Sequence, residues 1–177
     1  MSDTAPVAVL GLGNVLLGDD AAGPSTVHWL QANFIFPPGV SVQEIGTPGL
    51  DLLPYVSGRR AVIIVDTVTA DAPPGEVLLY RKDQIAMALT RPRLSPHDPG
   101  LAEAVACAEL AGQAPEHLAV VGIVPASTAT GMGLSDAVKE AIPVAGARVV
   151  RELEELGKPP RPRPVPLPDR PWWETEA

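Results

Sequence analysis

An unbroken run of aliphatic residues, Ala61-Val62-Ile63-Ile64-Val65, leads directly into Asp66. A strand built from this run has no polar position to turn toward water, so both of its faces must be covered. Strands of that kind lie in the middle of parallel sheets that have helices packed on each side. The run therefore predicts a central strand of an α/β domain, with a carboxylate at the end of the strand.

Strand-like and helix-like segments alternate along the rest of the chain. Further strands are expected at residues 8–10, 40–45, 76–80 and 118–124. Apolar residues recur at helical spacing in segments 27–34, 50–56, 101–108 and 138–156. Together with the central run, these segments predict a three-layer α/β domain with a mostly parallel sheet of five strands.

Helix boundaries are also marked in the sequence. Pro37-Pro38-Gly39 is expected to end the first helix, and Ser135 is the expected N-cap of the last one. Pro143 lies inside the last helical pattern, so we expect a kink or a break there. Cys107 falls in a helical segment next to alanines, which favours a buried packing role over a nucleophile.

The size and charge of the chain limit its partners. Its 177 residues suffice for one compact domain, and its net charge of −8 argues against nucleic acid or an anionic membrane surface. Cys107 is the single cysteine, so no intrachain disulfide can form, which fits a reducing compartment. No stretch approaches the ~18 apolar residues of a membrane helix, and the start Met1-Ser2-Asp3-Thr4 is not that of a signal peptide. We expect a cytoplasmic monomer.

The amino-acid composition of the chain changes after Gly157. Prolines recur through the last twenty residues, at positions 159, 160, 162, 164, 166, 168 and 171. We therefore expect a single domain over residues 1–157 and a stiff, extended, proline-rich tail without fixed structure over 158–177. Trp172 and Trp173 in this tail are either an anchor for a partner or flexible, and we favour the second.

Three polar groups are candidates for a functional site. Asp20 follows the first strand, Asp66 ends the central strand, and His97 lies in the loop Ser95-Pro96-His97-Asp98-Pro99. In open α/β sheets, ligands gather beyond the carboxyl ends of the strands. Two carboxylates and an imidazole could hold a divalent first-row metal and leave positions open for a substrate. The sequence thus favours a metal site, although the three residues lie far apart along the chain.

Structural roles compete with this interpretation. Asp66 could cap a helix or form a turn, and both Asp19 and Asp20 could cap the helix that follows them. We favour the cap for Asp19 and the metal for Asp20. His28 in a helix and His117 before a strand are expected to be structural or solvated.

The loop Gly11-Leu12-Gly13-Asn14-Val15-Leu16 resembles part of a dinucleotide-binding fingerprint. Leu16 takes the place of the third glycine, and no acidic residue clearly closes the second strand, since Glu44 is followed by Ile45-Gly46. No Gly-Lys-Ser/Thr is present for a P-loop, and Ser95 lacks the elbow of a serine hydrolase. The simplest role of the two glycines is to let the backbone turn sharply.

Several motifs, in this order, are similar to those of the [NiFe]-hydrogenase maturation endopeptidases. The resemblance runs from about Val7 to about Leu156 and rests on the segments 11–20 (GLGNVLLGDD), 46–49 (GTPG), 65–66 (VD), 95–97 (SPH) and 121–125 (VGIVP). It implies a twisted five-stranded α/β/α fold, and it implies that the metal-binding and catalytic positions are Asp20, Asp66 and His97. Some members have glutamate where this chain has Asp20, which is one methylene shorter.

The resemblance also implies the reaction. The substrate is a hydrogenase large-subunit precursor whose cysteines already hold nickel, and the enzyme reads this nickel with Asp20, Asp66 and His97. Hydrolysis of one peptide bond then removes a short C-terminal extension. Nickel is thus presented by the precursor, and the isolated protein could bind an adventitious divalent metal at the same residues.

Other functions remain open on the sequence alone. A non-catalytic α/β module could hold a metal or small ligand at the same loops, and it would bind metal without cutting peptide. A nucleotide-binding oxidoreductase domain is less favoured, because Leu16 breaks the fingerprint. A peptidase of the same fold with another substrate is the third alternative.

Overall fold

The computed structural model describes residues 6–82, 84, 85, 98–168, 171 and 173 of the chain. Five strands form one sheet in the order β3-β1-β4-β6-β5. Their bounds are Val7–Leu12 for β1, Val40–Gly46 for β3, Ala61–Thr67 for β4, Val77–Arg81 for β5 and His117–Ile123 for β6. Strands β1, β3, β4 and β6 are parallel, and β5 runs antiparallel to β6. The expected mostly parallel five-stranded sheet is confirmed.

Strand β4 occupies the centre of the sheet, as its aliphatic run predicts. All seven of its residues are buried. Ala61, Ile63 and Val65 pack into the core on one face, whereas Val62 and Ile64 pack into the core on the other. This alternation follows from the two-residue period of a strand and explains why no polar position is tolerated before Asp66.

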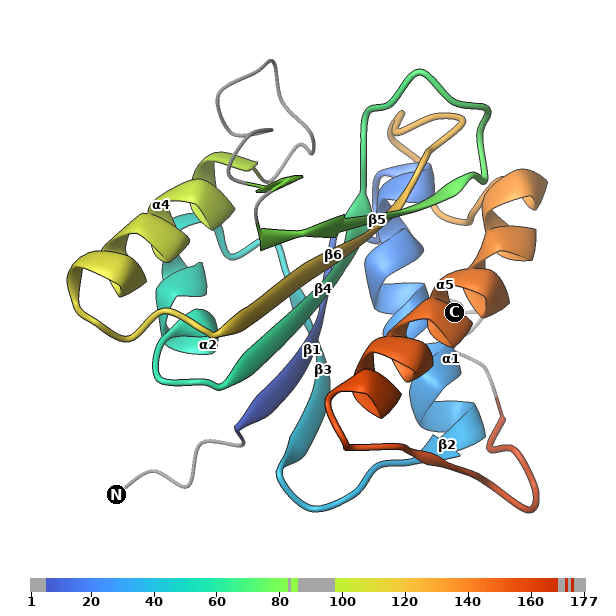
Figure 1. Cartoon of the computed structure of the whole chain (residues 1–177). Helices are drawn as coiled ribbons and strands as arrows, with labels where there is room; N and C mark the ends of the chain where they lie inside the picture. Colours follow the sequence, from blue (N-terminus) through green and yellow to red (C-terminus); the bar gives the residue numbers. More distant parts are fainter. Residues whose placement is uncertain (1–5, 83, 86–97, 169–170, 172, 174–177) are drawn as a thin grey trace.

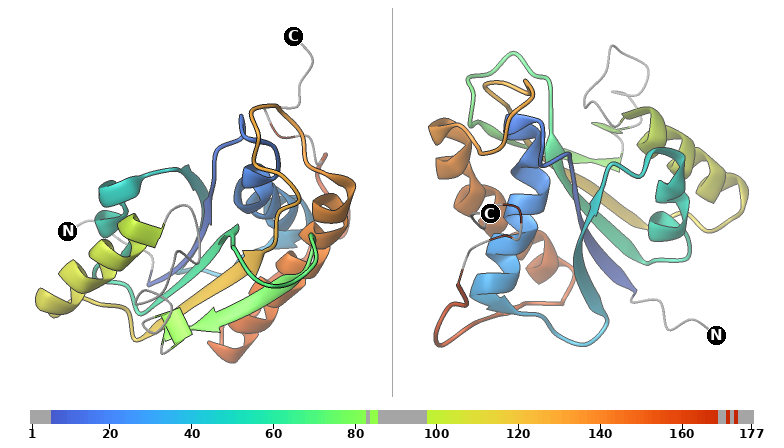
Figure 2. Two further views of the ribbon diagram at one scale, coloured as in Figure 1. Left: turned by 90° about the horizontal axis from the view of Figure 1, so that it is seen from above. Right: turned by 180° about the vertical axis from the view of Figure 1, so that it is seen from behind.

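Helices cover both faces of the sheet (Figure 1). On one face lie α1 (Ala22–Asn33) and α5 (Asp136–Glu155), and on the other lie η2 (Gly49–Leu52), α2 (Leu53–Val56) and α4 (Asp98–Leu110). The two further views show the same three layers (Figure 2). Among the described residues, no helix is both long and apolar enough to cross a bilayer.

The antiparallel direction of β5 has a simple cause. Residues 68–76, which join β4 to β5, form turns and no helix. A parallel neighbour needs a crossover of roughly a dozen or more residues, so this shorter connection turns the chain back instead. Strand β5 therefore closes the edge of the sheet beside β6.

Two local expectations are wrong, and the break that Pro143 could cause does not occur. Helix α1 ends at Asn33, before Pro37, because Phe34 and Ile35 form strand β2. Pro143 does not break α5, which runs to Glu155; Pro143 lies on the exposed face, where the carbonyl that loses its donor can face water. Cys107 is exposed, because it falls outside the buried stripe of α4.

The proline-rich tail has fixed structure where it is described, contrary to expectation. Arg161–Pro162 forms strand β7, which pairs antiparallel with β2 (Phe34–Ile35). Farther along the tail, the ring of Trp173 is only 5% exposed and meets the ring of His28 edge-on, with centroids 5.2 Å apart.

The tail is held because it supplies donors to the carboxyl end of α1. The last carbonyls of a helix have no partner within the helix. Arg163 N donates to Asn33 O at 2.8 Å, and Leu167 N donates to Ala32 O at 2.9 Å. Arg163 Nε donates to Gln31 O at 3.0 Å. The N–H groups that remain between the prolines thus cap the helix.

Removal of residues 158–177 should therefore destabilise the domain. Three hydrogen bonds to helix carbonyls are lost, so we expect the free energy of unfolding to fall by about 2–4 kcal/mol. Urea unfolding followed by circular dichroism measures the change. The control is Arg161→Ala, at an exposed position of β7, which should leave the urea midpoint nearly unchanged. If the truncated chain unfolds at the same urea concentration as the full chain, the capping role is contradicted.

Candidate active site

The turn that follows β1 brings a buried carboxylate to the carboxyl end of the sheet. Asp20 lies in the short helix η1 (Gly18–Ala21) and is 3% exposed. Its Oδ2 accepts a hydrogen bond from Asn14 N at 2.8 Å, and its Oδ1 accepts one from Thr67 Oγ1 at 3.1 Å. Asp20 is therefore oriented from two sides, by its own loop and by the end of β4.

Thr67 links this carboxylate to the second one. Asp66 is also 3% exposed, and its Oδ1 accepts a hydrogen bond from Thr67 N at 2.7 Å. The hydroxyl of Thr67 reaches Asp20, because Thr67 follows Val65 on the α1 face of β4. The structure thus brings two of the three predicted ligands to one end of the sheet. Thr67 and Asn14 were not singled out by the sequence, and both are adjacent to motif residues.

The third predicted ligand, His97, lies outside the described residues. It directly precedes Asp98, the first residue of α4. The start of α4 abuts the first residue of η2, since a side chain at Gly100 would collide with the backbone of Gly49. Among the described residues, no group of three His, Cys, Asp or Glu side chains is arranged to hold a metal, so the three-ligand site remains a prediction.

Asp19 has a different role from the expected one. It does not cap α1, whose N-cap has no side-chain hydrogen bond. Its Oδ2 accepts hydrogen bonds from Ala126 N at 2.8 Å, Ser127 N at 3.1 Å and Ser135 Oγ at 2.9 Å. Its Oδ1 accepts one from Ser135 N at 2.6 Å. Asp19 therefore ties η1 to the loop between β6 and α5.

These hydrogen bonds also determine the ionisation of Asp19. Burial alone would raise its pKa, but the backbone N–H groups of Ser135, Ser127 and Ala126 and the Ser135 hydroxyl stabilise the carboxylate. The net result is a pKa below the ordinary aspartate value. Ser135 is also the expected N-cap of α5, and its Oγ accepts a hydrogen bond from Val138 N at 3.4 Å.

The glycines before η1 serve close backbone packing and not a cofactor. Gly13 has φ +142°, and a side chain there would collide with the carbonyl of Asp20. A Cβ at Gly11 would lie 2.6 Å from the carbonyl oxygen of Gly23 in α1. In a dinucleotide fold the helix N-terminus beside the glycines faces the pyrophosphate. Here Gly13 packs against the carbonyl of Asp20 and against Pro24 of α1, so protein atoms fill the space that the glycine leaves. The structure therefore gives the oxidoreductase alternative no support.

A cavity of about 340 Å³ opens beside Asn14, whose backbone holds Asp20. It is lined by Gly13, Asn14, Val15, Pro24, Glu44, Gly46 and Thr47. Residues of two motifs, 11–20 and 46–49, line this cavity, and it offers room for substrate side chains beside Asn14, the residue that orients Asp20.

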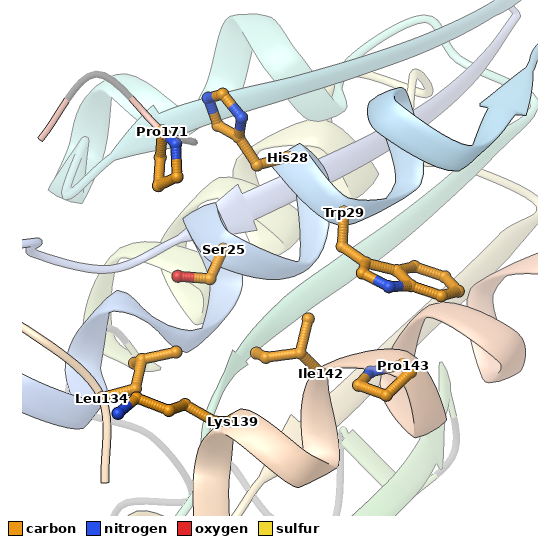
Figure 3. Close-up of a pocket in the computed structure, with 8 residues that line it drawn as sticks. All are labelled: Ser25, His28, Trp29, Leu134, Lys139, Ile142, Pro143 and Pro171. Atoms are coloured by element: carbon orange, nitrogen blue, oxygen red, sulfur yellow. The ribbon is translucent and has the colours of Figure 1, made fainter. Parts of the chain in front are cut away.

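A second cavity, of about 320 Å³, lies between α1 and α5 and is bordered by Pro171 of the tail (Figure 3). Trp29, Ile142 and Pro143 form its apolar side, and His28 and Lys139 are its ionisable groups. None of the residues that line it is a carboxylate. The cavity beside Asn14 is the better candidate for the site of chemistry.

Asp19→Asn should destabilise the protein. In the wild type the backbone N–H donors around Asp19 meet a carboxylate oxygen, whereas in the variant some of them would meet the NH₂ group of the amide. The free energy of unfolding should therefore fall by about 3 kcal/mol. Urea unfolding at pH 7 measures this loss. Asp136→Asn is the matched control, since the Asp136 side chain is 97% exposed, and a loss as large in the control would contradict the assignment.

The contribution of Asp19 should also depend on pH. Its folded-state pKa is lowered, so the stabilisation is fully present above the unfolded aspartate pKa of about 3.9 and is lost as the pH falls through the folded value. The stability difference between wild type and Asp19→Asn should be constant from about pH 7 to 5 and shrink below about pH 4. An undiminished difference at pH 3 would show that the carboxylate is not the stabilising form.

Comparison with known proteins identifies the family and agrees with the fold. The family model of hydrogenase maturation proteases matches residues 24–152. The hydrogenase 2 maturation protease of Escherichia coli (strain K12) is 33% identical over 158 residues, which cover 89% of this chain and 96% of that protein. The solved structure of the hydrogenase maturating endopeptidase HybD from E. coli has a TM-score of 0.83 at 34% identity and covers 89% of this chain and 97% of its own. The [NiFe] hydrogenase maturation protease HybD from Thermococcus kodakarensis has a TM-score of 0.66 at 30% identity and covers 85% and 97%. The chain therefore belongs to the hydrogenase maturation protease family.

Proposed function

We propose that this protein is an endopeptidase that removes the C-terminal extension of a [NiFe]-hydrogenase large-subunit precursor after nickel insertion. It recognises the nickel that the precursor carries. The observation that supports this function best is the pair of buried carboxylates, Asp20 and Asp66, joined through Thr67 at one end of the sheet. Family membership adds the reaction class.

The donor set suits nickel held by the precursor. Asn14 N donates a hydrogen bond to Oδ2 of Asp20, and Thr67 Oγ1 donates one to Oδ1. These two hydrogen bonds hold the carboxylate in one orientation at the end of the sheet, and carboxylate oxygens are common ligands of divalent metals. With His97 as the third ligand, the set combines two hard oxygens and an imidazole, which nickel accepts. In the isolated protein the same residues take up an adventitious divalent ion.

The chemistry is hydrolysis of one peptide bond. The oxygen of a water molecule bonds to the scissile carbonyl carbon, and a carboxylate that has left the metal accepts the proton of that water. The carbon–nitrogen bond then breaks, and the proton passes to the leaving amine. Nickel orients the scissile carbonyl or polarises the water. Because Asp20 and Asp66 must be deprotonated to bind metal, recognition of the precursor weakens in acid.

Incubation with nickel-loaded and nickel-free precursor tests this function. We expect cleavage of the loaded form alone, measured as the mass lost from the large subunit. Replacement of Asp20, Asp66 or His97 by Ala should lower the rate by about a thousandfold or more, with the unfolding midpoint monitored for each variant.

Matched substitutions control for charge and ring chemistry. Asp136→Ala removes an exposed carboxylate from α5, and His28→Ala removes an imidazole that lies away from the carboxylates. Both should process the precursor at the wild-type rate. Equal processing of loaded and nickel-free precursor would refute nickel recognition, and metal binding without any cleavage would favour the non-catalytic module.

A further inference from the structure

Two large apolar side chains are exposed on loops at the same end of the sheet as the carboxylates. Leu16, in the turn after β1, is 55% exposed, and Met132, in the loop between β6 and α5, is 59% exposed. A single exposed apolar residue is ordinary on a protein surface. These two differ because adjoining loops carry them at the same end of the sheet, and we call them the apolar rim.

The two loops are joined into one platform. Gly131 N donates to Leu16 O at 2.9 Å, and Gly18 N donates to Gly131 O at 2.7 Å. Asp19 N donates to Ser127 O at 3.0 Å, and the Asp19 carboxylate holds the same loop. Viewed from above, the loop between β6 and α5 (orange) lies beside the turn after β1 (dark blue) (Figure 2). The rim is therefore preformed, so little ordering entropy opposes binding to it.

The platform is continuous with the candidate active site. Leu16 N donates to Asn14 Oδ1 at 3.0 Å, and Asn14 N donates to Asp20 Oδ2 at 2.8 Å. An extended peptide advances about 3.3 Å per residue. A peptide whose scissile bond reaches Asp20 therefore places side chains within a few residues of that bond over the rim.

From this continuity, and on the basis of the proposed function, we infer that Leu16 and Met132 are specificity-determining residues that bind aliphatic side chains of the precursor's C-terminal segment next to the scissile bond. The other large apolar side chains exposed in the described part of the chain lie on other elements, such as Leu110 at the end of α4 and Val144 on α5. Burial of the rim by substrate contributes to binding and not to the chemical step, so it acts on KM.

The variants Leu16→Ser, Met132→Ser and the double variant test the rim on nickel-loaded precursor. Each single change should raise KM about tenfold and leave kcat within about twofold, with a larger rise for the double variant. The conservative variants Leu16→Ile and Met132→Leu keep an apolar side chain at each position and should therefore retain the wild-type KM. Leu110→Ser is the matched control, because Leu110 is 90% exposed and lies at the opposite end of the sheet.

Affinity for the precursor, measured by biolayer interferometry, separates this inference from the proposed function. If wild type binds the precursor without cutting it, the proposed function fails, and a tenfold weaker Kd for the rim variants still supports the rim. An unchanged KM and Kd in the double variant, or equal changes in Leu110→Ser, overturn the rim. If wild type neither binds nor cuts, both proposals fall. On a precursor with serine in place of the aliphatic residues next to the scissile bond, wild type and Leu16→Ser should have the same KM.

Discussion

The carboxylate of Asp19 is the interaction on which the functional end of the molecule depends. It accepts hydrogen bonds from Ala126, Ser127 and Ser135, and so it fastens the turn after β1 to the loop after β6. A buried carboxylate with this many donors is strongly committed to one geometry. Because Asp20 is the next residue, the same bonds fix where the candidate catalytic carboxylate points.

Close backbone packing makes that arrangement possible. Gly11 and Gly23 let α1 approach β1 until main chain meets main chain, and Gly13 leaves space for the carbonyl of Asp20. A side chain at Gly11 or Gly23 would push α1 away from β1, and a side chain at Gly13 would displace the backbone of Asp20 in η1. The glycine loop that resembles a phosphate-binding fingerprint thus serves to bring a carboxylate close to β4, which is the opposite electrostatic purpose from binding a phosphate.

The predictable parts of the fold are those that depend on local periodicity. The aliphatic run before Asp66 is enough to predict a buried central strand, and the rule for the carboxyl ends of strands brings Asp20 to the same edge. The role of Asp19 could not be predicted, because its partners are more than a hundred residues away and an aspartate before a helix is ordinarily read as a cap. The contact of Thr67 with Asp20 is long-range for the same reason. His97 stays a prediction from the motif.

The tail shows why composition alone misjudges order. Prolines lack an N–H donor, so a proline-rich segment can form few hydrogen bonds within itself. Arg163 and Leu167 nevertheless keep their backbone N–H groups and donate them to the last carbonyls of α1. The segment is ordered because its N–H groups pair with the last carbonyls of α1, and this long-range pairing cannot be read from the local sequence. Helix α1 is therefore held at both ends by distant parts of the chain: at its start through Asp19 and the loop after β6, and at its end through the tail. Since η1 runs directly into α1, restraint of the helix also restrains Asp20, and a functional site works best when its side chains are held in one geometry by such rigid elements.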